Sequence, residues 1–175
     1  MSRPIAPLIA TSAGAHAADQ LALAALPLTA VLAGEGGPGM VGALVAAQSA
    51  AWLVATLPAG VIVDRQPARR VIVAAQALAA LALGAAAIAA FAGALPALGV
   101  AVFVTGIGVV ALTLAANAAA PRLVAAGDLP RLNARLELAR AVVTLAAPAI
   151  AGALAAHLSP AWAYVLAPSP PPWPP

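Results

Sequence analysis

Five long runs of apolar residues, separated by short polar turns, dominate the sequence. Each run has at least the roughly 20 residues that an α-helix needs to cross the hydrocarbon core of a bilayer. The runs show no alternation of apolar and polar residues at a period of two, and they are about twice as long as the strands of a membrane β-barrel. The sequence therefore predicts five membrane-spanning α-helices, at about residues 5–32, 40–63, 71–92, 97–120 and 139–158.

The overall composition excludes most soluble proteins. Hydrophobic residues make up 64% of the chain and charged residues 7%, whereas a soluble domain has roughly 45–50% apolar and about 25% charged residues. Such a chain cannot cover its surface with polar groups, so a soluble enzyme is a remote alternative. The chain has no cysteine, which excludes a disulfide framework and a thiolate metal site. The expected fold class is an all-α membrane protein whose first partner is the lipid bilayer.

The positive charges all fall on one side of the predicted spans. The chain has no lysine, and its arginines are Arg3, Arg65, Arg69, Arg70, Arg122, Arg131, Arg135 and Arg140. The turns on the opposite side, 34–39 and 93–96, carry no positive charge. The positive-inside rule places the arginine side in the cytoplasm. We therefore expect a multi-pass protein of the cell membrane with a cytoplasmic N-terminus, and the arginines indicate topology rather than a nucleic-acid partner.

The densest group of charges follows the second span, in the stretch LPAGVIVDRQPARRVIVAAQ at residues 57–76. Its pattern is G-x-x-x-D-R-x-P-x-R-R, formed by Gly60, Asp64, Arg65, Pro67, Arg69 and Arg70. The carboxylate of Asp64 and the neighbouring guanidinium groups can form bidentate hydrogen bonds at the membrane boundary. The alternative is that the three arginines only fix topology and bind anionic lipid.

This pattern, between the second and third spans, resembles the signature loop of the major facilitator superfamily, G-x-x-x-D-R-x-G-R-R/K. Pro67 in place of Gly is typical of the branch that includes the enterobactin-exporter-like and macrolide-efflux-like proteins. Two further stretches resemble the same branch: AADQLALAALPL in the first span, and DLPRLNARLELARAVVTLAAPAIAGAL leading into the fifth. The resemblance implies the N-terminal six-helix bundle of a secondary transporter that normally has twelve helices.

The resemblance also implies roles for two groups of residues. The turn with Gly60, Asp64, Arg65, Arg69 and Arg70 would bridge to helices of the other half and favour the conformation closed on the cytoplasmic side, as one bundle rocks against the other. Separately, Pro148 and Gly152 resemble part of the helix-five motif of antiporters. Because Pro removes a helix hydrogen bond and Gly permits close approach, we expect a kink or a packing notch there.

Asp19 is the acidic residue expected within a span, where an ionisable side chain is expensive and usually faces the bundle interior or an aqueous cavity. His16, Asp19 and Gln20 are spaced i, i+3 and i+4, so they share one helical face. Proton coupling or lining of the substrate pathway is one interpretation of this face. A polar contact that holds the first helix to a neighbour is the other, unless the span boundary itself is misplaced.

Other patterns carry less chemistry. The sequence offers no nucleophile and base pair, no metal-ligand cluster and no Walker loop, so we expect no enzyme activity, metal or cofactor. The TGIGVVA run at 105–111 mimics a nucleotide-binding glycine pattern, but it lies inside a span and predicts helix packing. Asp128 is expected to cap a short cytoplasmic helix before the fifth span.

Residues 160–167 begin like a sixth helix, but the following PSPPPWPP cannot continue one because Pro lacks the N–H and clashes with the preceding turn. We expect a partial transmembrane bundle over 1–167 that is truncated in helix six, and a disordered Pro-rich tail at 168–175. Two functions stay open. One is secondary transport, an efflux of small amphipathic compounds with proton coupling as an option, by a fragment that lacks its C-terminal half. The other is a structural or accessory role beside a separate partner.

Overall fold

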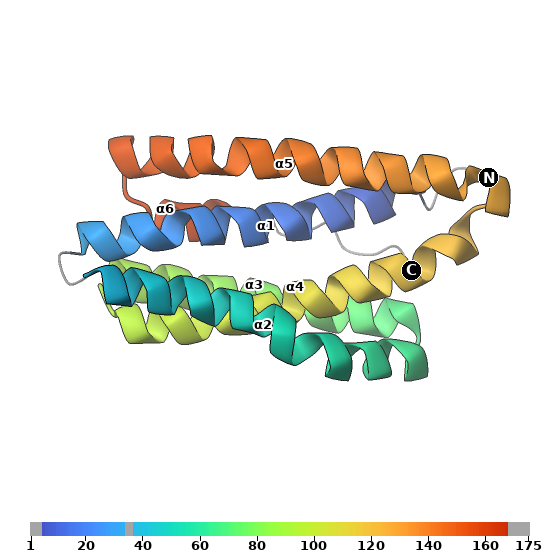
Figure 1. Ribbon diagram of the computed structural model, residues 1–175, viewed down its shortest axis with the longest axis horizontal. Helices are drawn as coiled ribbons and strands as arrows, with labels where there is room; N and C mark the ends of the chain where they lie inside the picture. The colour runs from blue at the N-terminus through green and yellow to red at the C-terminus, as the bar shows by residue number, and fades with distance from the viewer. Residues whose placement is uncertain (1–4, 34–36, 168–175) are drawn as a thin grey trace.

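The computed structural model describes residues 5–33 and 37–167. The elements, coloured in chain order in Figure 1, are α1 (Ile5–Leu32), α2 (Pro38–Arg65), α3 (Ala68–Phe91), α4 (Leu95–Leu123), η1 (Ala126–Asp128), α5 (Leu129–His157) and α6 (Trp162–Leu166). Helices α1 to α5 are each long and apolar enough to cross a membrane. These observations confirm the predicted fold class, an all-α bundle of about five transmembrane helices.

Proline and glycine set several helix ends. Helices α2, α4 and α5 each carry a proline in their first two positions, where the missing N–H removes no helical hydrogen bond. Gly93 ends α3 with φ 67, in the left-handed region that a glycine adopts without steric cost. The N–H of Ala94 then donates to the oxygen of Ala89 at 2.9 Å, which closes the turn. The chain therefore reverses tightly, and α4 returns antiparallel to α3.

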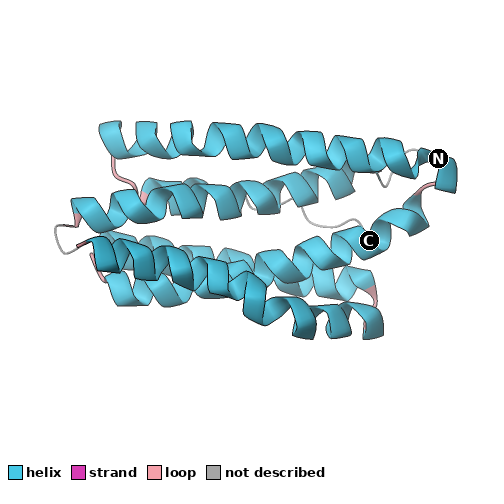
Figure 2. Ribbon diagram, in the orientation of Figure 1, coloured by secondary structure: helices cyan, strands magenta, loops and turns pink. Residues whose placement is uncertain are grey.

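The long helices lie side by side along the longest axis of the bundle (Figure 1), and short loops connect them (Figure 2). Helix α1 packs against α5, while α4 packs against α2, α3 and α1. The start of α1, the end of α2, the start of α3, the end of α4 and the start of α5 all lie at one end of the bundle. This end, which we call the arginine end, carries the turns with Arg65, Arg69, Arg70, Arg122, Arg131 and Arg135.

The packing between helices is dominated by small side chains. Alanine contributes most of the buried apolar positions, including fully buried Ala22, Ala51 and Ala115. Many large apolar side chains point outward, and Leu53 and Leu145 are more than four-fifths exposed. So many exposed large apolar side chains are unusual in a soluble domain. This distribution suits a bilayer, where lipid solvates large apolar groups and small residues let helix backbones approach closely.

Two glycines of α4 provide the closest of these approaches. A Cβ at Gly106 would lie 2.6 Å from the Cβ of Ala51 on α2, and a Cβ at Gly108 would lie 2.9 Å from the main-chain oxygen of Ala75 on α3. Any larger side chain would therefore push a neighbouring helix away. These contacts confirm that the glycine pattern at 105–111 serves helix packing.

The fifth helix begins earlier than the apolar run predicted. Helix α5 starts at Leu129 rather than at residue 139, and the polar segment expected to form a separate short helix is its first turns. Leu132 and Leu136 bury one stripe of this segment against Leu8 and Ala116, so an amphipathic stretch continues the helix. Asp128 occupies the N-cap position, but its side chain makes no capping hydrogen bond.

A short sixth helix, α6, packs against α3 and α1. Tyr164 is 2% exposed, and its hydroxyl lies 3.4 Å from Oγ1 of Thr29. The rings of Trp162 and Phe91 meet edge to face, with centroids 5.9 Å apart. These contacts hold α6 across the ends of α1 and α3. The Pro-rich stretch 168–175, which the sequence predicts to be a disordered tail, lies outside the described residues.

Candidate functional site

Asp19 lies near the middle of α1, a helix of 28 residues that is about 42 Å long at 1.5 Å per residue. Its side chain is buried, with the whole residue 5% exposed. A carboxyl group buried at this depth is costly unless it is hydrogen-bonded. Its hydrogen-bond partners within the protein identify the neighbouring helices that matter.

The main partner is Gln48 of α2, which is itself 3% exposed. Its Nε2 donates to the main-chain oxygen of Asp19 and to the carboxyl Oδ1, both at 3.0 Å. Gly106 lets α2 approach α4 one turn further along, at Ala51. The other amide atom, Oε1 of Gln48, is buried and has no hydrogen-bond partner among the described residues. One acceptor in the bundle interior is therefore open to a donor.

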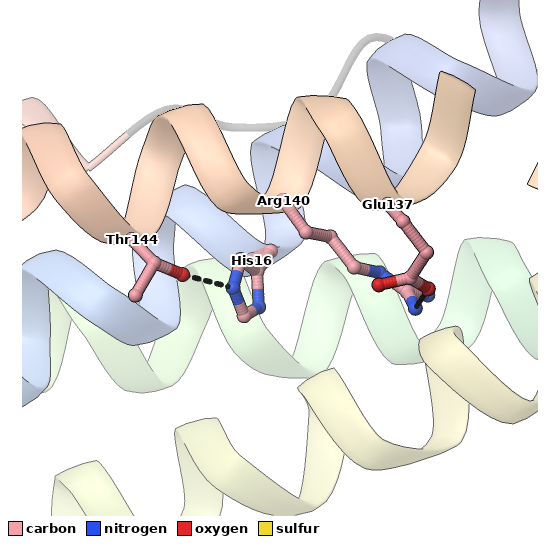
Figure 3. A network of polar contacts seen from close by, with 4 residues as sticks. All are labelled: His16, Glu137, Arg140 and Thr144. Atoms are coloured by element: carbon pink, nitrogen blue, oxygen red, sulfur yellow. Dashed lines mark hydrogen bonds and ion pairs between the residues drawn. The ribbon is translucent and has the colours of Figure 1, made fainter. Parts of the chain in front are cut away.

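Gln20 and His16 extend the site from α1 toward α5. Nε2 of Gln20 donates to Oδ2 of Asp19 at 3.5 Å, so both carboxyl oxygens have amide donors. Nε2 of His16 lies 2.9 Å from Oγ1 of Thr144 on α5. Figure 3 shows this contact spanning the two helices. The predicted face of His16, Asp19 and Gln20 thus divides, since Asp19 contacts α2 and His16 contacts α5.

Two charged residues of α5 lie beside His16 in Figure 3. Nη1 of Arg140 donates to Oε1 of Glu137 at 2.7 Å, and both charges act electrostatically on His16. The Arg140 side chain is 20% exposed. Its Nη2 atom is buried without a hydrogen-bond partner in the described part of the chain. We call the group formed by His16, Asp19, Gln20, Gln48, Glu137, Arg140 and Thr144 the polar cluster.

The sequence indicated the α1 members of this cluster but missed Thr144 and the role of Arg140. Thr144 is exposed on α5. A single threonine in an apolar span gives no sequence signal. Arg140 did give one, because it follows the start of the fifth apolar run instead of preceding it. An arginine inside a span usually faces a polar interior.

A cavity of about 420 Å³ lies between α1 and α5 next to the polar cluster. Its lining residues are Gln20, Leu23, Ala24, Leu28, Pro148 and Gly152. The structure thus brings Gln20 together with the two helix-five residues that the sequence singled out separately. Gly152 is not a notch for close packing, because a Cβ there would meet nothing within 4 Å. Its missing side chain leaves room in the cavity instead.

The turn that resembles the family's signature loop lies at the arginine end, away from the polar cluster. Helix α2 ends at Arg65 and α3 begins at Ala68. Asp64, Arg65, Arg69 and Arg70 are all exposed, and Gly60 has open space around it. The expected pairing of Asp64 with these arginines is not formed, since the ion pairs of the described residues are Arg131–Asp128 and Arg140–Glu137. An ion pair exposed to water contributes little stability, because water already solvates both charges. These charges therefore have little reason to pair with one another on the exposed surface.

Within residues 5–33 and 37–167, no group of three or more His, Asp or Glu side chains is placed to hold a metal ion. The polar cluster combines buried groups, such as Asp19 and Gln48, with exposed ones, such as Glu137, and it offers hydrogen-bond donors, acceptors and titratable groups. Such a site can bind a polar group or exchange a proton.

Residues 8–168 match the family described as the Major Facilitator Superfamily. No curated protein and no solved structure matches the chain. The match covers most of α1 and all of α2 to α6, including the polar cluster and the turn at 60–70. Members of this family are multi-pass membrane transporters. The chain therefore belongs to the Major Facilitator Superfamily.

Proposed function

We propose that the chain forms the N-terminal helical bundle of an efflux transporter for small amphipathic compounds, in the enterobactin-exporter-like and macrolide-efflux-like branch. The observation that carries this proposal is the buried carboxyl of Asp19, which receives amide hydrogen bonds from two residues, one of which, Gln20, lines a cavity. Pro67 in the signature turn supports the branch.

Asp19 is the group that we propose to exchange a proton during transport. As a carboxylate it accepts hydrogen bonds from the amides of Gln48 and Gln20. Once protonated it becomes a donor, and the open Oε1 of Gln48 is an acceptor on the same side chain. Rotation of the Gln48 amide would therefore let one residue satisfy both states of Asp19. A proton can thus be gained and lost without leaving a buried charge unpaired.

The cavity between α1 and α5 supports an amphipathic substrate. Leu23 and Leu28 supply apolar surface, and Gln20 supplies an amide that reaches both the cavity and Asp19. A substrate that hydrogen-bonds Gln20 would compete for the amide that Asp19 uses. We propose that this competition couples substrate binding to the proton, with His16 and Arg140 adjusting the local charge.

A second helical bundle would complete the cavity and the gate. The charges at Asp64, Arg65, Arg69 and Arg70 are exposed and form no ion pairs among themselves. They are therefore available to pair with charges on a second bundle at the arginine end, which we propose to face the cytoplasm. Rocking of the two bundles would make and break these pairs.

The proposal is tested with inverted membrane vesicles from cells that carry the gene at its native locus, as wild type, D19N or D19E. Ethidium or rhodamine 6G is added outside the vesicles as an amphipathic probe, and its uptake into the vesicles, driven by an imposed pH gradient, is measured. Wild type should take up probe, D19E should retain part of the rate, and D19N should lose it. Uptake in D19N equal to wild type would show that Asp19 carries no proton in transport.

A further inference from the structure

A second cavity, of about 410 Å³, lies at the arginine end of the bundle. The start of α1, the end of α4 and the start of α5 form its walls, and Figure 1 shows these three segments meeting at that end. We call it the terminal cavity. It shares no lining residue with the polar cluster, so the proposed transport chemistry does not account for it.

The inner part of the terminal cavity is apolar. Ile5, Leu123, Val124 and Leu132 line it. Leu132 is 3% exposed and belongs to the packed contact between α1, α4 and α5, with Ile5, Leu123 and Val124 against its edge. This floor is therefore a packed apolar surface at one end of the candidate membrane-spanning helices.

The rim of the cavity is charged. Arg131 and Arg135 lie one turn apart on the same face of α5, and Asp128 precedes them at its N-cap. Nη1 of Arg131 is 4.0 Å from the Asp128 carboxylate, and these side chains are 86% and 62% exposed. A pair this long and solvated is weak. Arg135 forms no ion pair within the described residues, so the rim has a net charge of +1 with guanidinium donors to spare.

A small anion would pair with the arginines of the rim but leave the apolar floor exposed to water. An apolar molecule would cover the floor but form no ion pair with the arginines. A phospholipid with one net negative charge fits both, because its phosphate matches the rim and its glycerol and acyl carbons match the floor. A zwitterionic lipid fits less well, since its own cation opposes Arg131 and Arg135. The cavity lies at one end of helices that are long enough to cross a membrane, where lipid headgroups are found.

We propose that the terminal cavity is a binding site for the headgroup of an anionic glycerophospholipid, held by Arg131 and Arg135 above an apolar floor. The site goes beyond the proposed transport function and does not depend on it. Its charge and shape select the lipid, and the phosphate lies between the two guanidinium groups.

The test measures lipid retention by the full chain in native mass spectrometry, after titration of the delipidated protein with phosphatidylglycerol or phosphatidylcholine. The probe variants are R131A/R135A, which removes the rim charge, and V124W, which fills the cavity and keeps every charge. The matched control is R69A/R70A, which removes the same charge at the other arginine turn of this end. Gel filtration establishes that each variant remains folded.

Phosphatidylglycerol should bind more tightly than phosphatidylcholine to wild type. R131A/R135A should weaken it by about fivefold per arginine, or about 25-fold in all, V124W should weaken it as well, and R69A/R70A should leave it unchanged. Equal losses of binding in R131A/R135A and R69A/R70A, or full lipid retention in V124W, would mean that the lipid binds through general surface charge. Either result would overturn the proposal. Displacement of the lipid by glycerol 1-phosphate at matched concentration would identify a soluble-phosphate site and overturn it too.

Discussion

One side-chain nitrogen of Gln48, Nε2, donates to two oxygens of Asp19, the main-chain oxygen and carboxyl Oδ1, each at 3.0 Å. The contact joins α1 to α2 across 29 residues of sequence, with both side chains in the bundle interior. It therefore serves the fold and the proposed proton site at once, and the two roles separate in a mutational test.

We expect Q48L to lower the stability of the bundle by about 1–2 kcal/mol, because it leaves the carboxyl of Asp19 buried with one weak donor. The double variant D19L/Q48L should recover most of this loss, since it removes both polar partners and leaves an apolar contact. Melting temperatures of the purified chain in detergent give the comparison. Equal destabilisation in the single and double variants would show that the hydrogen bonds contribute little.

A second prediction concerns the close approach at Gly108. We expect G108A to destabilise the bundle by about 1–3 kcal/mol, because its Cβ would lie 2.9 Å from the main-chain oxygen of Ala75. The matched control is G84A on α3, where a new Cβ meets nothing within 4 Å. G84A should be neutral or slightly stabilising, since alanine favours a helix over glycine. Thermal unfolding of both variants checks the difference, and equal melting temperatures would contradict the packing described.

The orientation of the bundle is open to direct measurement because the chain has no cysteine. Single cysteines are introduced at Gly127, exposed in η1 at the arginine end, and at Leu158, 66% exposed at the opposite end. If the arginine end faces the cytoplasm, a membrane-impermeant maleimide should label L158C in intact cells and G127C only after permeabilisation. The reverse pattern would place the N-terminus outside.

The number of membrane helices could be predicted because the length of an apolar run is set by bilayer thickness. The start of α5 could not, because the segment before residue 139 is polar in composition and helical only through one buried stripe, which includes Leu132 and Leu136. The mean hydropathy of a segment averages over all faces of a helix, whereas packing depends on the one face that is buried.

The candidate site was likewise predictable only in part. Asp19 stands out from its own span, because a carboxyl in an apolar run is rare. Its partner Gln48 and the His16 partner Thr144 do not stand out, because they depend on which helices pack together and at what rotation. That information lies in small-residue contacts such as Gly106 against Ala51, which are distant in sequence and common in composition.

The pairing of α1 with α5 gives the last prediction. With cysteines at His16 and Thr144, whose side chains are in hydrogen-bond contact at 2.9 Å, a short bifunctional thiol reagent should join the helices in high yield. The control pair is H16C with L145C, since Leu145 is the next residue of α5 and is 81% exposed on its outer surface. Cleavage at a protease site engineered at Gly127, followed by gel electrophoresis, separates linked from unlinked halves. Similar linkage of both pairs would mean that Thr144 of α5 does not face α1. The polar cluster would then lose its α5 residues and consist of the contacts between α1 and α2 alone.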